Sequence, residues 1–177
     1  MNKSFKKSQT KRILILVENL YEDLELWYPK IRLQEEGFKV LVAGPENKTY
    51  CGKHGLSVIP DVDINSINES DFDGLVIPGG FAPDWLRRLP QVLALVKEFN
   101  RSNKLIAFIC HAGWVPISAK ILKGRHVTSL PAIKDDMINA GAIWQDLPVV
   151  IDRNLVSSRR PDDLPQFCKG IISLLNN

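Results

Sequence analysis

Short apolar runs alternate with amphipathic segments along most of the chain. Residues 13–17 are a continuous run of Ile, Leu and Val, which is typical of a strand buried on both faces. Over residues 20–36, apolar residues recur every three or four positions, which predicts an amphipathic helix that ends at Gly37. The apolar face of this helix is expected to comprise Leu20, Leu24, Trp27, Tyr28 and Ile31. A second apolar run at 40–44 completes a strand–helix–strand unit, whose strands we expect to be parallel.

The alternation continues to the C-terminus. Further strands are predicted at residues 74–77, 105–109 and 126–129, and a hairpin at 149–157 that turns at Arg153 and Asn154. Helices are predicted at residues 84–100, with a break near Pro90, and at 113–122, 133–140 and 161–175. This order predicts one domain over residues 12–177, with a three-layer α/β fold around a mostly parallel sheet.

Composition and charge narrow the function classes. The chain has 177 residues, of which 45% are apolar and 24% charged, as in globular domains. Five of the 23 basic residues lie in residues 1–12, which contain no acidic residue. The rest of the chain has 18 basic and 20 acidic residues, which gives it a net charge of −2. We therefore expect residues 1–11 to be a disordered basic tail and the domain to lack a nucleic-acid-binding face. The chain shows no apolar run of about 20 residues and no secretory or transit pattern, which predicts a cytoplasmic protein that does not bind membranes.

Three segments that follow predicted strands carry reactive or polar residues. Ligands of α/β folds bind at the carboxyl ends of the strands, so we expect these segments to form one site. They are residues 17–25, 78–84 and 109–114. The sequence lacks both a Cys-x-x-Cys pair and a Gly-x-Gly-x-x-Gly fingerprint, so neither a metal nor a dinucleotide cofactor is expected.

Cys110 is the strongest candidate for a catalytic residue in these segments. It ends an apolar strand and is followed at once by helix-forming sequence, the layout of a nucleophile elbow. Backbone N–H groups and a helix dipole at that position favour the thiolate, and the adjacent His111 can exchange a proton with it. An isolated cysteine is more often a small buried residue, but the adjacent histidine and the nearby glycines favour a catalytic role for Cys110.

Two further features are expected to complete the site. Gly79 and Gly80 can bring backbone N–H groups to a reacting oxygen as an oxyanion hole, although such a pair is also an ordinary tight turn. Glu22 and Glu25 lie three residues apart on one helix face, and acids are common in a first helical turn. A carboxyl beside Cys110 would be desolvated and have a raised pKa, as suits a proton donor or acceptor.

Several ordered motifs strengthen this interpretation. They are Tyr21-Glu-Asp-Leu-Glu-Leu26, Gly52-Lys-His-Gly55, Pro78-Gly-Gly80, Ile109-Cys-His111, the segment 133–141 and Val156-Ser-Ser-Arg159. Together they resemble the PfpI-type intracellular protease and deglycase family, within the superfamily of the parkinsonism-associated deglycase. The resemblance runs from about residue 11 to the C-terminus.

This resemblance implies a fold and a set of roles. The fold is a flavodoxin-like sandwich, related to that of class I glutamine amidotransferases. Cys110 would be the nucleophile, His111 its partner and Glu25 the carboxyl that hydrogen-bonds the thiol. Relatives often complete the site with an acid of a neighbouring subunit, here Asp84, which implies a homo-oligomer. Where the family usually has Gly, often followed by Pro, after Cys-His, this chain has Ala112 and Gly113.

Three function classes remain open at this point. The first is a cofactor-free stress-protection enzyme of the glyoxalase or deglycase type, acting on small dicarbonyls or early glycation adducts. The second is an intracellular cysteine peptidase, and the third is a non-enzymatic holdase or a redox sensor in which Cys110 is oxidised. A small aldehyde suits a pocket closed by subunit contacts, which favours the first class.

Overall fold

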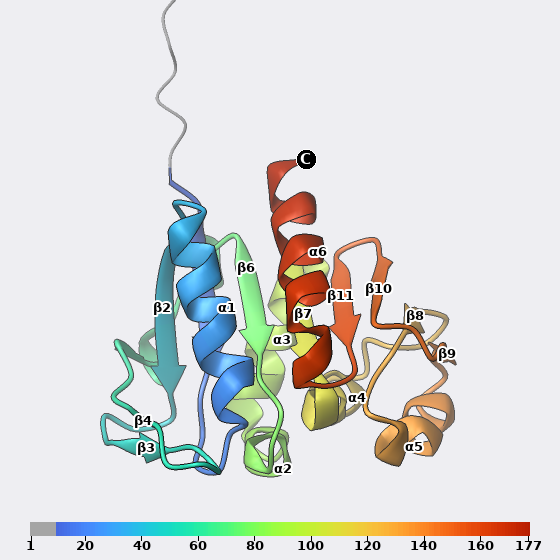
Figure 1. The fold of residues 1–177 in the computed structure, drawn as a ribbon, viewed down its shortest axis with the longest axis horizontal. Coiled ribbons are helices and arrows are strands. Elements are labelled where there is room, and N and C mark those ends of the chain that lie inside the picture. Colours follow the sequence, from blue (N-terminus) through green and yellow to red (C-terminus); the bar gives the residue numbers. More distant parts are fainter. Residues whose placement is uncertain (1–9) are drawn as a thin grey trace, which may run out of the picture.

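The computed structural model describes residues 10–177, which form one seven-stranded sheet with helices on both faces (Figure 1). The strand order is β10-β11-β7-β6-β1-β2-β5. Their bounds are β1 Arg12–Leu16, β2 Lys39–Gly44, β5 Val62–Asp63, β6 Gly74–Ile77, β7 Leu105–Ile109, β10 Val149–Asp152 and β11 Leu155–Ser158. All neighbouring strands are parallel except the β10–β11 hairpin, so the predicted fold class is confirmed.

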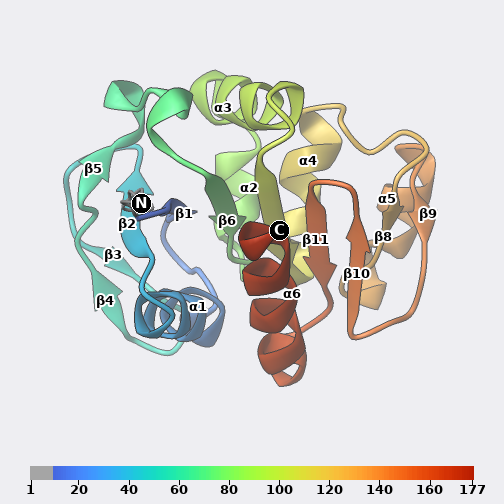
Figure 2. The same ribbon diagram turned by 90° about the horizontal axis from the view of Figure 1, so that it is seen from above.

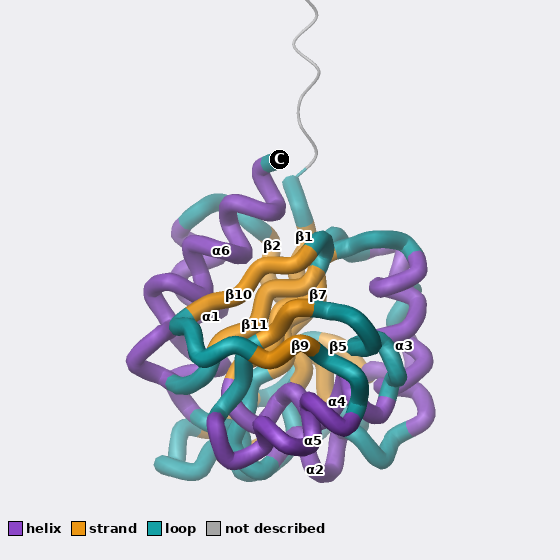
Figure 3. Tube along the Cα trace, turned by 90° about the vertical axis from the view of Figure 1, so that its right-hand side faces the viewer, coloured by secondary structure: helices purple, strands orange, loops and turns teal. Residues whose placement is uncertain are grey.

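The helices form the two outer layers (Figures 2 and 3). One layer consists of α1 Asp23–Glu35 and α6 Leu164–Asn176. The other consists of α2 Ala82–Leu86, α3 Pro90–Arg101 and α4 Trp114–Ser118, and α5 Lys134–Asn139 lies beyond α4. Pro90 separates α2 from α3, as predicted, because a proline lacks the N–H that a continuous helix requires.

Short strands and single helical turns complete the chain. Two small sheets pair β3 Tyr50–Cys51 with β4 Ser57–Val58, and β8 His126–Val127 with β9 Ile143–Trp144. Single 3₁₀ turns occupy Ile64–Ser66, Glu69–Asp71, Cys110–Gly113, Pro131–Ile133 and Pro161–Asp163. The strand predicted at 126–129 is thus only two residues long and lies outside the main sheet, and the helix predicted from residue 113 ends earlier, at Ser118.

The three central strands form the most deeply buried part of the molecule. Residues 13–16 of β1, 75–77 of β6 and 106–109 of β7 have no solvent exposure. The carboxyl ends of these strands lie together at the lower edge in Figure 1, beside α2. A rigid central platform therefore holds the three segments that carry the candidate chemistry.

The orientation of α1 differs from the prediction. The predicted apolar face is largely exposed: Leu24 is 54% exposed, Tyr28 38% and Ile31 61%. The buried face consists instead of Asp23, Glu25, Leu26, Pro29 and Leu33. The helix has apolar residues on two sides, and the sheet covers only the side that carries Glu25.

Two expectations concern the ends and surfaces of the chain. The predicted tail falls mainly on residues 1–9, which lie outside the described residues; the Lys11 carbonyl already accepts a hydrogen bond from the Lys39 N–H, at 2.9 Å. Within residues 10–177, none of the helices has the length and apolar character needed to span a bilayer.

Candidate active site

Cys110 lies where β7 ends and a 3₁₀ turn begins, at the middle of the sheet. Its φ angle is +63°, in the left-handed region that costs a side-chain-bearing residue about 1–2 kcal/mol. The backbone then enters α4, so the predicted strand–turn–helix layout is present. The thiol is largely buried, with 8% of the residue exposed. Strain at a reactive residue that the surrounding structure enforces is typical of an active site.

Glu25, in the first turn of α1, is fully buried. Its Oε2 accepts a hydrogen bond of 2.7 Å from the Gly79 N–H, whereas its Oε1 has no hydrogen-bond partner among residues 10–177. A buried carboxyl oxygen without a partner is costly unless the group is protonated or meets a ligand. Gly79 packs against both the carboxyl and the cysteine: a Cβ there would lie 2.5 Å from Oε2 of Glu25 and 2.7 Å from Cβ of Cys110. The absence of a side chain at this position lets the carboxyl and the thiol interact directly.

Two loops hold this arrangement together. Tyr21 and Gly80 form an antiparallel bridge, and the Phe81 N–H donates to the Leu20 carbonyl at 2.9 Å. Gly80 has φ +80°, and a Cβ there would lie 2.4 Å from the Leu20 carbonyl oxygen and 2.5 Å from the Glu22 nitrogen. Glycine is therefore required at position 80 for the loop before α1 to dock onto the loop after β6.

Burial controls the protonation of Glu25 and Cys110. Desolvation raises the pKa of Glu25 from 4.5 to about 8, against the Gly79 hydrogen bond and with a further increase from the Glu22 charge. Desolvation and then the charge of Glu25 raise the pKa of Cys110 to about 12, although the N–H groups of His111 and Gly80 oppose this. The backbone N–H groups thus favour the thiolate, as predicted, but burial and the charge of Glu25 outweigh them. Protonating Glu25 removes the repulsion, so the site can hold one negative charge but resists two.

The imidazole of His111 lies beside the thiol. Its Nδ1 lies 3.4 Å from Sγ of Cys110. Desolvation, and then the positive charge of Lys53, lowers the pKa of His111 below its usual 6.5. A neutral imidazole beside a protonated thiol can accept the sulfur proton, which is the arrangement that nucleophilic thiol chemistry requires.

A polar cluster at the start of α1 lies next to this group. Glu22 pairs with the Lys53 ammonium at 3.0 Å and with Nε2 of His54 at 3.4 Å. The two oxygens of Asp23 accept the N–H groups of His54 and Leu56, each at 2.8 Å. This explains the Gly52-Lys-His-Gly55 motif, whose backbone wraps around Asp23.

A cation could in principle use this cluster, because Glu22, Asp23 and His54 offer ligand atoms within 4.8 Å of one another. However, the two oxygens of Asp23 already accept backbone hydrogen bonds, and Glu22 is paired with Lys53. These contacts satisfy the cluster without a metal.

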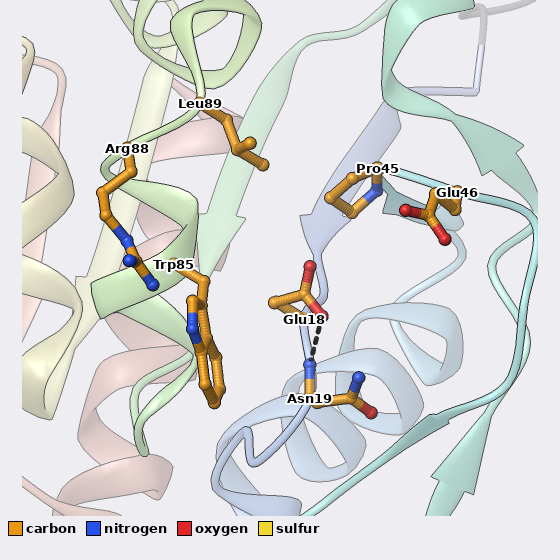
Figure 4. Close-up of a pocket in the computed structure, with 7 residues that line it drawn as sticks. All are labelled: Glu18, Asn19, Pro45, Glu46, Trp85, Arg88 and Leu89. Atoms are coloured by element: carbon orange, nitrogen blue, oxygen red, sulfur yellow. Dashed lines mark hydrogen bonds between the residues drawn. The ribbon is translucent and has the colours of Figure 1, made fainter.

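Asp84 lies apart from the other predicted residues. Its carboxyl is exposed on α2 and pairs with Arg88 at 3.3 Å. Arg88 belongs to a cavity of about 480 Å³ at the same sheet edge, shown in Figure 4. Trp85, Arg88 and Leu89 form one wall of this cavity and face Glu18, Asn19, Pro45 and Glu46. Cys110 does not line it.

The sequence and the fold are similar to those of known proteins. The sequence profile of the DJ-1/PfpI family matches residues 11–174. The chain belongs to the DJ-1/PfpI family. It is 44% identical over 164 residues to deglycase PfpI of Pyrococcus furiosus, covering 93% of this chain and 99% of that protein. It is 40% identical over 167 residues to a candidate cysteine protease of Bacillus subtilis, YraA, covering 94% and 99%.

Solved structures agree with this membership. A two-domain Anabaena variabilis protein, with DJ-1/ThiJ/PfpI-like and ferritin-like domains, has a TM-score of 0.93 and 41% identity. The match covers 94% of this chain and 48% of that one. The predicted family is confirmed, and the relatives named here are a deglycase and a candidate cysteine protease.

The structure differs from the predicted DJ-1/PfpI site in two details. The Gly79 N–H is used by Glu25, so of the two predicted oxyanion donors only that of Gly80 is directed at the sulfur position. At Gly113, the place of the proline expected often in the family, a Cβ would lie 2.8 Å from the sulfur of Met137, so this residue lets α4 pack closely on α5. The preceding Ala112 is fully buried.

Sequence reasoning missed two contributions to the site. One is Lys53, whose charge acts on both Glu25 and His111. The Gly-Lys-His-Gly motif carried a signal for it, but the motif does not reveal that the loop folds back onto α1. The other is the contact between His111 and Trp114, whose ring centroids lie 5.2 Å apart.

Proposed function

We propose that this protein is a cofactor-free cysteine enzyme of the glyoxalase or deglycase type, acting on small 2-oxoaldehydes and early glycation adducts. The observation that carries the proposal is the cluster at Gly79, in which a buried, largely protonated Glu25 lies beside Cys110 and a neutral His111. An acid, a nucleophile and a base thus meet at one point. Relatives named deglycases support the same class.

The first step is addition of the thiol to the aldehyde. Sγ of Cys110 attacks the aldehyde carbon while its proton passes to Nδ1 of His111. The carbonyl oxygen takes a proton from Glu25, whose pKa of about 8 keeps it protonated at neutral pH. The product is a hemithioacetal on Cys110, an imidazolium and a carboxylate.

The second step moves hydrogen between the two substrate carbons. The Glu25 carboxylate removes the proton from the former aldehyde carbon, and the imidazolium of His111 returns one to the neighbouring oxygen, which gives an enediol. Glu25 then protonates the second carbon, and the hydroxyl on the former aldehyde carbon loses its proton to His111. The product is a thioester on Cys110. Water then hydrolyses the thioester to a 2-hydroxy acid and the free thiol, so methylglyoxal plus water becomes lactate.

A peptidase role is the second candidate, favoured by the similarity to YraA. Acyl transfer needs N–H donors directed at the developing oxyanion. The Gly79 N–H, the obvious donor, is bonded to Glu25 at 2.7 Å. Proton movement between carbons has no such requirement but needs a carboxyl of raised pKa, which Glu25 supplies. The dicarbonyl role therefore ranks first.

The active form is proposed to be a homo-oligomer. The exposed stripe Leu24, Tyr28 and Ile31 recurs at helical spacing along α1, and large apolar residues grouped on a monomer surface favour a protein contact. Within one chain the exposed carboxyl of Asp84 pairs with Arg88 rather than with His111. A contribution from Asp84 to the site of a second subunit agrees with this position.

The test is the conversion of methylglyoxal to lactate without glutathione. We expect the native protein to form lactate and Cys110→Ala to form none. Cys51→Ala is the matched control, because Cys51 is an exposed thiol outside the site and its loss should leave the rate unchanged. Native, correctly assembled protein that forms no lactate refutes the proposal. Activity that survives in Cys110→Ala refutes it as well.

A further inference from the structure

The side chain of Trp114, in the first turn of α4, contacts the imidazole of His111 from the side. The ring centroids are 5.2 Å apart and the planes are inclined by 50°, a favourable tilted geometry for two aromatic rings. Trp114 is half-buried, so its indole also removes water from one face of His111. The orientation of the imidazole beside Cys110 therefore depends on where this indole lies.

Two neighbouring helices fix the indole. Its Nε1 donates a hydrogen bond of 2.8 Å to Oδ2 of Asp136 on α5. The guanidinium of Arg87, which follows α2, lies 5.5 Å from the indole centroid, and its Nε donates to Oγ of Ser118 at 2.9 Å. Arg87 therefore contacts the π face of the indole, and Asp136 binds its N–H edge.

We propose that Trp114 is a positioning residue, which holds the His111 imidazole in hydrogen-bonding reach of the Cys110 thiol and is itself held by Asp136 and Arg87. The role rests on the proposed function of Cys110 and His111 as nucleophile and base. Misplacing a reacting group by about 1 Å can reduce a rate roughly a hundredfold. A wall of the site that is fixed by three helices prevents such a displacement.

Charged groups near His111 also act on its pKa, and their contribution has to be distinguished from that of the Trp114 contact. Glu25 and Lys53 act on the site from α1 and from the loop before β4. Arg87 and Asp136 reach it only through Trp114, from α2 and α5. Cys110 is the adjacent titratable group. Changing Trp114 alone leaves all five charged or titratable groups in the chain.

The experiment uses two readouts that do not depend on turnover. One is the pKa of His111, followed by NMR of its ring proton. The other is the alkylation rate of Cys110 by iodoacetamide, measured in a Cys51→Ala background because Cys51 is exposed. Lactate formation is measured separately, so a failure of the proposed reaction remains distinguishable from a failure of the positioning role.

Four variants separate the contributions of the ring, the N–H and the carboxylate. Trp114→Leu removes the aromatic contact, and we expect alkylation to slow roughly tenfold and the pKa of His111 to rise toward about 6.5. Trp114→Phe and Asp136→Ala each break the Nε1 hydrogen bond; each should show a smaller loss, and the two losses should not add in the double variant. Asp136→Asn keeps an acceptor and should restore near-native behaviour.

The matched control is Trp144→Phe. Trp144 is also half-buried, its Nε1 donates to Oγ of Ser129 at 3.0 Å, and the Lys134 ammonium lies 5.1 Å from its ring. It does not contact His111, so both readouts should stay at native values. The proposal is overturned if the Trp114 variants change both readouts no more than Trp144→Phe does. It is also overturned if they lower only the melting temperature. If Trp114→Leu does not fold, the Trp114→Phe and Asp136→Ala pair decides between these results.

Discussion

Replacing Glu25 by glutamine should make the stability of the protein, relative to the native one, increase strongly as the pH rises. The pKa of Glu25 rises from 4.5 to about 8 because the folded chain buries the carboxyl. Such a group favours folding in its protonated form, so its ionisation in the unfolded chain lowers stability as the pH rises from about 4.5 to about 8. Glutamine is nearly isosteric, cannot ionise and still offers an oxygen to the Gly79 N–H.

The size of the effect follows from the two pKa values. The pH-dependent penalty of Glu25 is roughly 1 kcal/mol at pH 5 and roughly 4 kcal/mol at pH 8. The stability of Glu25→Gln relative to the native protein should therefore increase by about 3.5 kcal/mol between these pH values. The buried amide N–H₂ of glutamine carries a penalty of about 1–3 kcal/mol if it finds no acceptor, but this penalty is the same at both.

Urea denaturation at pH 5 and pH 8, under reducing conditions, measures this difference. With a slope of about 2 kcal/mol/M, the gap between the two midpoints should widen by roughly 1.7 M urea. Glu35→Gln is the matched control, because Glu35 lies on the same helix but is exposed, and it should show no such change. A midpoint difference between Glu25→Gln and the native protein that is equal at the two pH values refutes the buried, protonated state of Glu25.

Two substitutions and a pH–rate profile test the site and the surface further. Gly80→Ala should lower stability by several kcal/mol and abolish activity, because φ of +80° and a 2.4 Å contact both oppose a Cβ there; melting and lactate assays measure this. Ile31→Glu should shift the proposed homo-oligomer toward monomer in light scattering, since it places a charge in the exposed apolar stripe. The activity of the native protein should rise as His111 deprotonates below pH 6.5 and fall as Glu25 ionises near pH 8, and a pH–rate profile measures both limbs.

Each of these tests has a control or a contrary result. Gly37→Ala has φ +93° but nothing within 4 Å, so it should show the backbone penalty alone, and an equal loss at both glycines would contradict the steric argument. Ile138→Glu changes an exposed isoleucine on α5; if it dissociates the oligomer as Ile31→Glu does, the α1 stripe is not the contact. A rate that keeps rising through pH 9 argues against Glu25 as the proton donor.

The sheet and its helices were predictable because their signal is local. The runs at 13–17, 74–77 and 105–109 are apolar in every position, as strands buried on both faces require. A strand was predicted at 126–129, where β8 lies, but the two-residue strand β9 and the separate sheet that the two strands form were not predicted.

The orientation of α1 shows where this local signal fails. A periodicity argument assigns the apolar stripe to the core, yet the helix buries a carboxylate-bearing face because Glu25 reaches Gly79, 54 residues further along the chain. The candidate site depends on similar long-range contacts. Cys110 and His111 were found from their place after a strand, whereas the use of the Gly79 N–H and the Trp114–Asp136 bond depend on packing that the sequence does not display.

The left-handed backbone at Cys110 has a consequence for how this protein can evolve. Glycine or asparagine adopts φ near +63° with less strain than cysteine, so either residue would relax the turn. Selection for heat resistance alone should therefore tend to replace the thiol, and only selection for its chemistry retains it. At position 110, selection for stability and selection for activity would therefore favour different residues.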